Sequence, residues 1–152
     1  MQKITPFLWF DNNLEEALTL YTSIFKDSEI LSINRMGEGG PVFTGRFRIH
    51  GQEFYALNGG PMFKFTEAFS VFVSCETQAE VDYYWEKLSE GGEKSQCGWL
   101  KDKFGLSWQI IPNALGELMG DPNPAKAQAV TQAMMQMGKI IIKDLQKAHE
   151  NA

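Results

Sequence analysis

Residues 4–10 form an apolar, aromatic segment, which is typical of a β-strand. Because successive side chains of a strand point to opposite faces, Thr5, Phe7 and Trp9 lie on one face, and Leu8 and Phe10 lie on the other. The polar tripeptide at residues 11–13 then ends the apolar segment. We therefore predict a short aromatic strand that ends at Phe10.

After this strand the apolar residues recur at helical spacing. Asn13 is a suitable N-cap, and Glu16 three positions later completes a capping-box pattern. The apolar positions that follow at helical spacing are Leu14, Ala17, Leu18, Tyr21, Ile24 and Phe25. They predict a helix with one apolar stripe that packs against a sheet.

Three more strand-like segments complete the first half of the chain, at residues 29–34, 42–50 and 53–58. Glycine-rich turns separate or end these segments, at residues 37–41 and 59–61. The first half is therefore predicted to have the order βαβββ.

The same order then begins again at residues 69–74 with a second strand-like segment. Thr77 and Glu80 form a second capping-box pattern, and the helix they begin is predicted to end at the Gly91–Gly92 pair. Two short strands follow, near residues 95–100 and 106–111, so we expect one short strand to be missing from this half. We interpret the repeated order as an internal structural duplication.

A helical tail is predicted to end the chain. Asn123 is a cap followed by proline at the first helical position, and Ala127, Val130, Met134 and Met137 recur along one helical face. The pattern as a whole predicts an α+β fold in one domain, residues 1–152. We expect a first βαβββ module at residues 1–68, a second at 69–116 and the tail at 117–152.

The composition is that of an ordinary globular protein and excludes several classes. Of the 152 residues, 43% are hydrophobic and 22% are charged, which is enough apolar surface for a sizeable core. The net charge is −5 and no cluster of basic residues is present, which argues against nucleic-acid binding. No segment has the length or apolar character of a membrane span or a signal peptide, and Cys75 and Cys97 are isolated. We expect a cytoplasmic protein with reduced thiols.

Five segments resemble the PhnB-like family, often labelled a 3-demethylubiquinone-9 3-methyltransferase domain. The family lies in the vicinal oxygen chelate superfamily, which also contains glyoxalases, bleomycin resistance proteins and dioxygenases. The segments are residues 5–11, 56–61, 75–77, 98–112 and 121–124. The resemblance implies paired βαβββ modules that form a curved sheet around a cavity, with a homodimer as the usual assembly. It implies little about chemistry.

The resemblance also implies four positions where metalloenzymes of the superfamily carry their ligands. Those positions hold Thr5, Asn58, Ser70 and Gln109, whose neutral hydroxyls and amides are poor ligands for a transition metal. We therefore expect no tightly bound metal and no other cofactor. These four residues form either a hydrogen-bonding set at the bottom of a cavity or ordinary polar groups within a sheet.

Apolar residues share strand faces with these polar positions and predict an aromatic cavity. The ligand-binding candidates are Thr5, Phe7, Trp9, Asn58, Ser70, Phe72, Trp99 and Gln109. The alternative for each apolar member is a filled core. We expect Trp99 at the cavity rim and Trp108 on the opposite face from Gln109, under a helix. No catalytic residue is identified.

Two further features argue against specific chemistries. Cys75 lies near a predicted helix N-terminus, which would lower its thiol pKa, but no histidine is placed to act as its base, so we interpret it as structural. No strand–glycine-loop–helix pattern that could hold S-adenosylmethionine is present. The methyltransferase label therefore has no support in these residues.

Three hypotheses for function follow. The first is binding of a small, mostly apolar organic molecule in an aromatic cavity without a metal. The second is an enzyme, either a metal-assisted lyase, isomerase or dioxygenase or the ubiquinone-type methyltransferase of the family label. The third is a drug-sequestering protein like those for bleomycin resistance. We expect a homodimer, with the apolar face of the tail as one possible contact.

Overall fold

The computed structural model describes residues 2–152, which divide into two compact units, residues 2–65 and Thr66–Ala152. Each unit contains one four-stranded sheet. No helix within residues 2–152 is long and apolar enough to cross a membrane.

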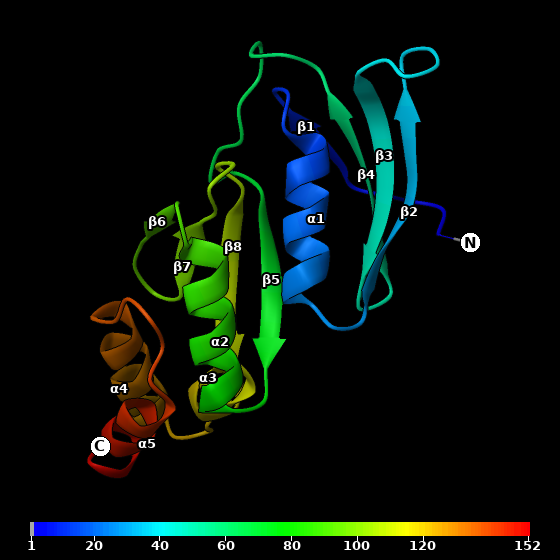
Figure 1. The fold of residues 1–152 in the computed structure, drawn as a ribbon. Helices are drawn as coiled ribbons and strands as arrows, with labels where there is room; N and C mark the ends of the chain where they lie inside the picture. Colours follow the sequence, from blue (N-terminus) through cyan, green and yellow to red (C-terminus); the bar gives the residue numbers. More distant parts are fainter. Residues whose placement is uncertain (1) are drawn as a thin grey trace. The chain divides into compact units, whose positions relative to one another are not determined.

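The first unit is a βαβββ module (Figure 1). Its elements are β1 (Phe7–Phe10), α1 (Leu14–Ile24), β2 (Ser28–Arg35), β3 (Val42–Ile49) and β4 (Gln52–Asn58). The strand order is β1-β4-β3-β2, with β1 parallel to β4 and the other neighbours antiparallel. The order of elements confirms the prediction for the first half.

Helix α1 covers one face of this sheet with the predicted apolar stripe. Leu14, Ala17, Leu18 and Tyr21 are buried on the helix, and Leu8, Phe10, Phe47, Phe54 and Ala56 are buried on the sheet. Gly45 of β3 permits the close approach, because a Cβ atom there would lie 3.1 Å from Leu14 and 3.2 Å from Leu18. The helix and the alternate strand positions together form the core of the unit.

The second unit repeats this arrangement. Its sheet contains β5 (Ser70–Cys75), β6 (Glu93–Lys94), β7 (Trp99–Lys101) and β8 (Ser107–Pro112), and α2 (Gln78–Ser89) follows β5. The strand order β5-β8-β7-β6 is equivalent to that of the first unit, which confirms the duplication. The expectation of a missing strand was wrong: β6 occupies that place, although it is only two residues long.

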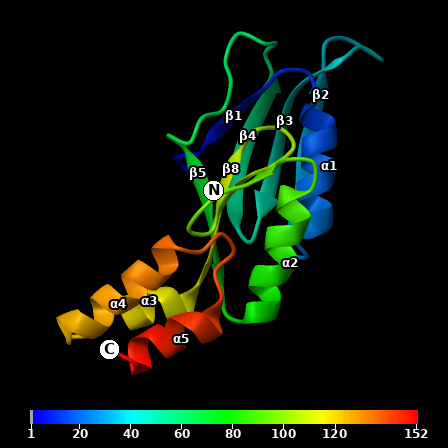
Figure 2. The same ribbon diagram turned by 90° about the vertical axis from the view of Figure 1, so that its left-hand side faces the viewer.

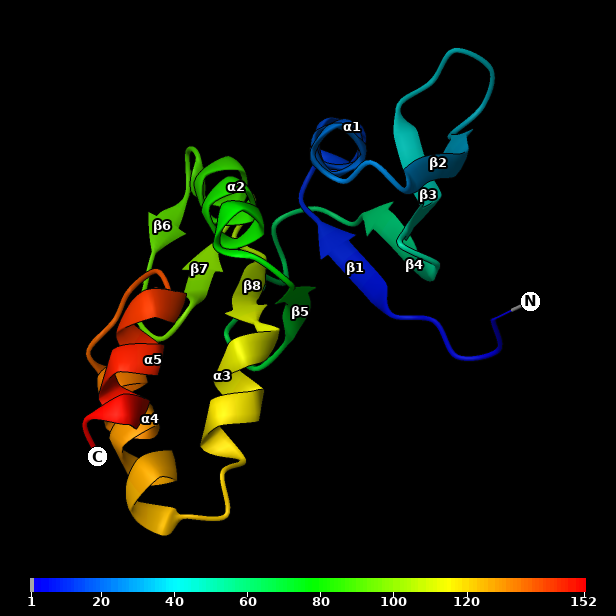
Figure 3. The ribbon, with the colours of Figure 1, turned by 90° about the horizontal axis from the view of Figure 1, so that it is seen from below.

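The tail packs as part of the second unit. It contains α3 (Asn113–Met119), α4 (Pro124–Met135) and α5 (Ile142–Glu150), and α3 begins directly after β8. Ile111, Leu115, Val130, Ile140 and Leu145 form a second buried cluster, with Leu118, Met134 and Met137 packed against it. Figure 2 and Figure 3 show α4 and α5 beside each other in this group.

This packing changes the interpretation of the tail. We expected Ala127, Val130, Met134 and Met137 to offer a surplus face for a second subunit. Val130 is buried, and Met134 and Met137, which are partly buried, pack against the same cluster of their own unit. The side chain of Gln78, the first residue of α2, joins the tail to this helix by two hydrogen bonds. It donates to the carbonyl of Ile140 at 3.0 Å and accepts from the amide of Ile142 at 2.8 Å.

Candidate ligand-binding site

The candidate residues of the second unit lie on the face of its sheet opposite α2. The strand register pairs Ser70 with Ser107, Phe72 with Gln109, Trp99 with Gln109, and Lys101 with Ser107. Side chains of paired residues share a face, and successive residues alternate between faces. Four predicted site residues therefore come together: Ser70, Phe72, Trp99 and Gln109.

Trp108 shows that side chains alternate between the two faces of β8. It belongs to the opposite face, and its side chain is buried, only 1% exposed, as is its neighbour Leu100. Both lie on the side covered by α2, as predicted for Trp108. Trp99 and Gln109, which lie on the open face, are half-buried.

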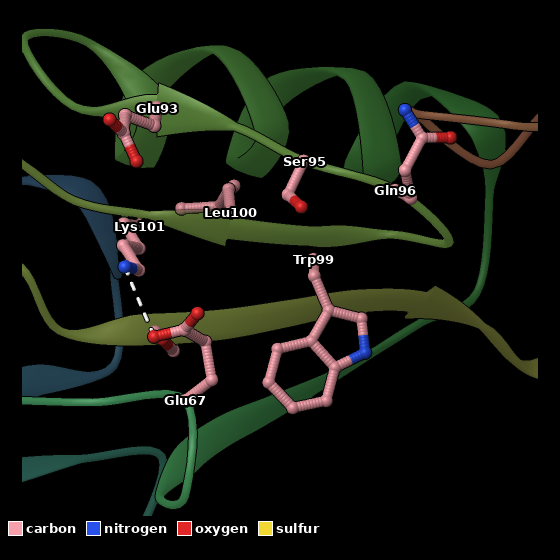
Figure 4. Close-up of a pocket in the computed structure, with 8 residues that line it drawn as sticks. Glu67, Glu93, Ser95, Gln96, Trp99, Leu100 and Lys101 are labelled. Carbon is pink, nitrogen blue, oxygen red and sulfur yellow. Dashed lines mark ion pairs between the residues drawn. The ribbon is translucent and has the colours of Figure 1, made fainter.

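A cavity of about 320 Å³ lies on this side of the unit, which we call the Trp99 cavity (Figure 4). Its lining residues are Glu67, Glu93, Ser95, Gln96, Trp99, Leu100, Lys101 and Ser107. Figure 4 shows the Lys101–Glu67 pair at one end of the cavity and Gln96 at the other, with the Trp99 indole between them. Trp99 is the single residue of the predicted set in this lining.

Charged groups gather at one end of the Trp99 cavity. The ammonium of Lys101 pairs with the carboxylate of Glu67 at 3.0 Å. The hydrogen bond from Lys101 lowers the pKa of Glu67 below its usual range. Glu93 lies opposite Lys101 in the register of β6 and β7. Two carboxylates and one ammonium give the lining a net charge of −1.

Ser107 is unusual among the lining residues. Its side chain is completely buried, yet its hydroxyl has no hydrogen-bond partner within the described part of the chain. Buried polar groups in proteins are nearly always paired, because an unpaired one forfeits its hydrogen bonds to water. The sequence reasoning missed Ser107, although its place two residues before Gln109 puts both on one strand face.

Gln109 and Ser70 form a pair of their own. The amide nitrogen of Gln109 donates to the hydroxyl of Ser70 at 3.0 Å. This bond joins the neighbouring strands β8 and β5 on their open face. Neither residue belongs to the lining of the Trp99 cavity, so this bond corresponds to the second interpretation, that of ordinary polar groups within a sheet.

The first unit carries an aromatic surface on the sheet face opposite α1. Phe7 and Trp9 lie there, beside Tyr55, whose ring centroid is 5.7 Å from that of Phe7. The indole of Trp9 donates to the carbonyl of Gly60 at 2.9 Å and contacts Phe63 edge to face at 4.9 Å. Thr5 precedes β1 and is half-buried. Sequence reasoning did not include Tyr55 or Phe63.

Asn58 lies on the other face of that sheet. It pairs in register with the buried residue Phe10, on the side of α1. Its side-chain oxygen accepts from the backbone amide of Leu14 at 3.0 Å, and its side-chain nitrogen donates to the backbone carbonyl of Val42 at 3.1 Å. Asn58 therefore holds the first turn of α1. Asn13 occupies the predicted N-cap position, but its side chain forms no capping bond in the described chain.

The expected ligand positions do not fit a transition metal. The side-chain oxygen of Asn58 already accepts from the Leu14 amide, and the Ser70 hydroxyl accepts from the amide nitrogen of Gln109. Across residues 2–152, no group of three or more His, Cys, Asp and Glu side chains could hold a metal ion. His149 bonds to Asp121, and His50 lies at a turn. Neutral hydroxyls and amides bring no charge to offset the dehydration of a divalent ion.

Cys75 is unsuited to act as a nucleophile. Its side chain is fully buried, and burial raises the pKa of its thiol to about 12, with a further contribution from the Glu80 carboxylate. Burial therefore outweighs any lowering by the N-terminus of α2. This agrees with a structural role.

Two βαβββ modules with equivalent strand order define a protein of the vicinal oxygen chelate fold. The chain belongs to the PhnB-like, or 3-demethylubiquinone-9 3-methyltransferase, family, whose sequence pattern matches residues 2–111. The PhnB protein of Bacillus cereus is 40% identical, with a TM-score of 0.68 over 73% of this chain and 99% of that one. A search of curated proteins finds no match.

More distant structures share the fold alone. Protein PA1353 from Pseudomonas aeruginosa is 19% identical with a TM-score of 0.63, over 74% of this chain and 98% of that one. The fosfomycin resistance protein FosX from Listeria monocytogenes, solved with Mn(II) and sulfate, is 16% identical. Its TM-score is 0.54 over 71% of this chain and 89% of that one.

Proposed function

We propose that this protein binds a small organic molecule in the Trp99 cavity without a tightly bound metal. The observation that carries the proposal is the cavity itself, which has one aromatic wall, charged groups at one end and Gln96 at the other. Small-molecule sites combine apolar surface with few directional polar groups. A volume of about 320 Å³ suits a ligand with one or two rings.

Trp99 supplies the apolar part of the proposed site. Its half-buried ring leaves surface for a ligand to cover, whereas Trp108 on the other face is already buried by its own unit. Burial of apolar surface stabilises a complex by about 25 cal/mol per Å². The contact of a ligand with this ring is therefore expected to supply much of the affinity.

A thermal-shift screen of small aromatic and aliphatic compounds tests the proposal. Hits should raise the melting temperature of the native protein and of Tyr83→Ala, a control that removes an exposed ring from α2, outside the cavity. The same hits should lose most of their effect on Trp99→Ala. Stabilisation that is unchanged in Trp99→Ala would contradict the proposed site.

A turnover assay on each hit separates a binding protein from an enzyme. A hit consumed at a rate that depends on added metal would favour the lyase, isomerase or dioxygenase hypothesis. Transfer of a methyl group to a ubiquinone precursor would favour the family label. Retention of an unchanged drug would favour sequestration. We expect binding without turnover.

Elemental analysis tests the metal expectation directly. We expect protein purified without chelator to retain less than stoichiometric zinc, nickel, iron or manganese after gel filtration. Weakly held Mg²⁺ would be lost on dialysis with little change in melting temperature, because ligand stabilisation scales with the logarithm of concentration over dissociation constant. One retained equivalent that Gln109→Ala removes would contradict the proposal.

We also propose a homodimer, on the grounds of the family resemblance. Light scattering at micromolar concentration should return about twice the mass of 17.2 kDa for one chain. Because Met134 packs within its own unit, Met134→Lys should lower the melting temperature without dissociating the dimer. A mass of one chain for the native protein would contradict the dimer.

A further inference from the structure

The unpaired hydroxyl of Ser107 points to a ligand. The residue is completely buried and lines the Trp99 cavity, and its hydroxyl forms no hydrogen bond with any described residue. Its neighbours in register, Lys101 and Ser70, bond instead to Glu67 and Gln109. An unpaired buried hydroxyl costs stability, so a ligand group that bonds to it gains an interaction for which water does not compete.

The charge at this end of the cavity favours a cation. Lys101 and Glu67 offset each other through their 3.0 Å contact. Glu93 remains, and within residues 2–152 its carboxylate joins neither an ion pair nor a hydrogen bond. The remaining charge is therefore that of one carboxylate, which attracts a positively charged group and repels an acid.

Trp99 suits the same class of ligand. The face of an indole ring carries negative potential and attracts cations, and it also packs against apolar groups. Its ring lies along the cavity between the charged end and Gln96 (Figure 4). One ligand could therefore place an ammonium group at the charged end and its apolar body on the ring.

We infer that the Trp99 cavity takes a small organic amine in its ammonium form, whose N–H group donates to the hydroxyl oxygen of Ser107. Glu93 provides the opposing charge, and Trp99 packs against the apolar body. The inference rests on the proposed function, because it names the ligand class for the same cavity. Ser107 is then a binding residue whose unpaired hydroxyl lowers the stability of the free protein.

Three aromatic probes of similar shape test the charge preference: 2-phenylethylamine, 2-phenylethanol and phenylacetate. Each is titrated into the full chain at pH 7, and the indole N–H resonance of Trp99, assigned from Trp99→Phe, reports the dissociation constant. We expect the amine to bind about fivefold more tightly than the alcohol. Phenylacetate is expected to bind most weakly.

Substitutions at Ser107 and Glu93 test whether these residues cause the preference for the amine. Ser107→Ala should weaken amine binding about fivefold. It should also raise the melting temperature of the free protein, an effect opposite to that of losing a structural hydrogen bond. Glu93→Gln should weaken binding of the amine and leave the alcohol unchanged. Glu90→Gln, which removes an exposed carboxylate outside this cavity, should change neither.

The outcomes separate this inference from the proposed function. Tightest binding by phenylacetate or the alcohol, or full amine affinity in Ser107→Ala, would overturn the inference while leaving a ligand site at Trp99. If neither these probes nor any hit of the thermal-shift screen depends on Trp99, the proposed function fails, and the inference fails with it. A Ser107→Ala protein that melts at a lower temperature would also overturn the binding role of Ser107.

Discussion

The indole nitrogen of Trp108 donates a hydrogen bond to the carboxylate of Asp102 at 2.9 Å, and both side chains are buried. The other carboxylate oxygen accepts from the amides of Phe104 at 2.9 Å and Leu106 at 3.0 Å. One buried acid therefore closes the turn between β7 and β8. Those two strands carry Trp99, Lys101 and Ser107, so the turn also fixes the cavity.

Removing this carboxylate should destabilise the protein strongly. Asp102→Ala leaves the Trp108 indole and two backbone amides without their acceptor, which should lower the free energy of unfolding by about 3 kcal/mol. Urea denaturation followed by tryptophan fluorescence measures the change. Asp27→Ala is the control, because that side chain is 80% exposed, and its effect should stay below about 0.5 kcal/mol. Equal effects would contradict the role of Asp102.

A matched pair of glycine substitutions separates steric overlap from backbone strain. Gly98 and Gly105 have similar positive φ angles, 84° and 90°. A Cβ atom at Gly98 would lie 2.7 Å from the side chain of Ile111, whereas one at Gly105 would meet nothing within 4 Å. Gly105→Ala should cost about 1 kcal/mol, from strain alone, and Gly98→Ala about 3 kcal/mol. Thermal unfolding of both variants would show whether the difference exists.

The contact between Asp121 and His149 should affect stability in acid. Two hydrogen bonds to its carboxylate lower the pKa of Asp121. The larger effect comes from the backbone amide of Asn123, and the next from the ring of His149, 2.7 Å away. A carboxyl group with a lowered pKa stabilises the folded state above its unfolded pKa of about 4, and this contribution is lost as the pH falls through the folded value.

Asp121→Asn should therefore lower the melting temperature at pH 7 and narrow its difference from the native protein as the pH falls below about 4. Glu150→Gln removes an exposed carboxylate from the end of α5 and serves as the control. Melting curves between pH 7 and pH 3 provide the measurement. A difference that is constant across this range would show that the ionised form of Asp121 contributes nothing.

The two cysteines should react at very different rates. Cys75 is buried and its thiol pKa is raised to about 12, whereas Cys97 is half-buried at the turn before β7. Because the thiolate is the reactive form, iodoacetamide at pH 8 should label Cys97 first. Peptide mass spectrometry should detect label on Cys75 only when urea is added. Labelling of Cys75 in the folded protein would contradict its burial.

Period-two alternation placed Ser70 and Phe72 on one face of β5, and the strand register adds Trp99 and Gln109 to that face. Of these four residues, Trp99 alone lines the Trp99 cavity. Asn58 was expected among the cavity residues, but it lies on the face covered by α1, because it has the same parity along β4 as the buried residues Phe54 and Ala56. Alternation assigns residues to two faces, but it does not say which face a helix covers.

The sequence by itself determined four features: the order of strands and helices, the apolar stripe of α1, the Thr77 cap and the duplication. These features depend on residues close together in the chain, where dihedral preferences and side-chain spacing act directly. Only the tertiary structure decided that the tail covers its own Met134 and Met137, that Asn58 holds α1, and that Ser107 is buried without a partner. Each depends on which distant segments pack together, because burial and hydrogen-bond pairing are properties of contacts that no local pattern specifies.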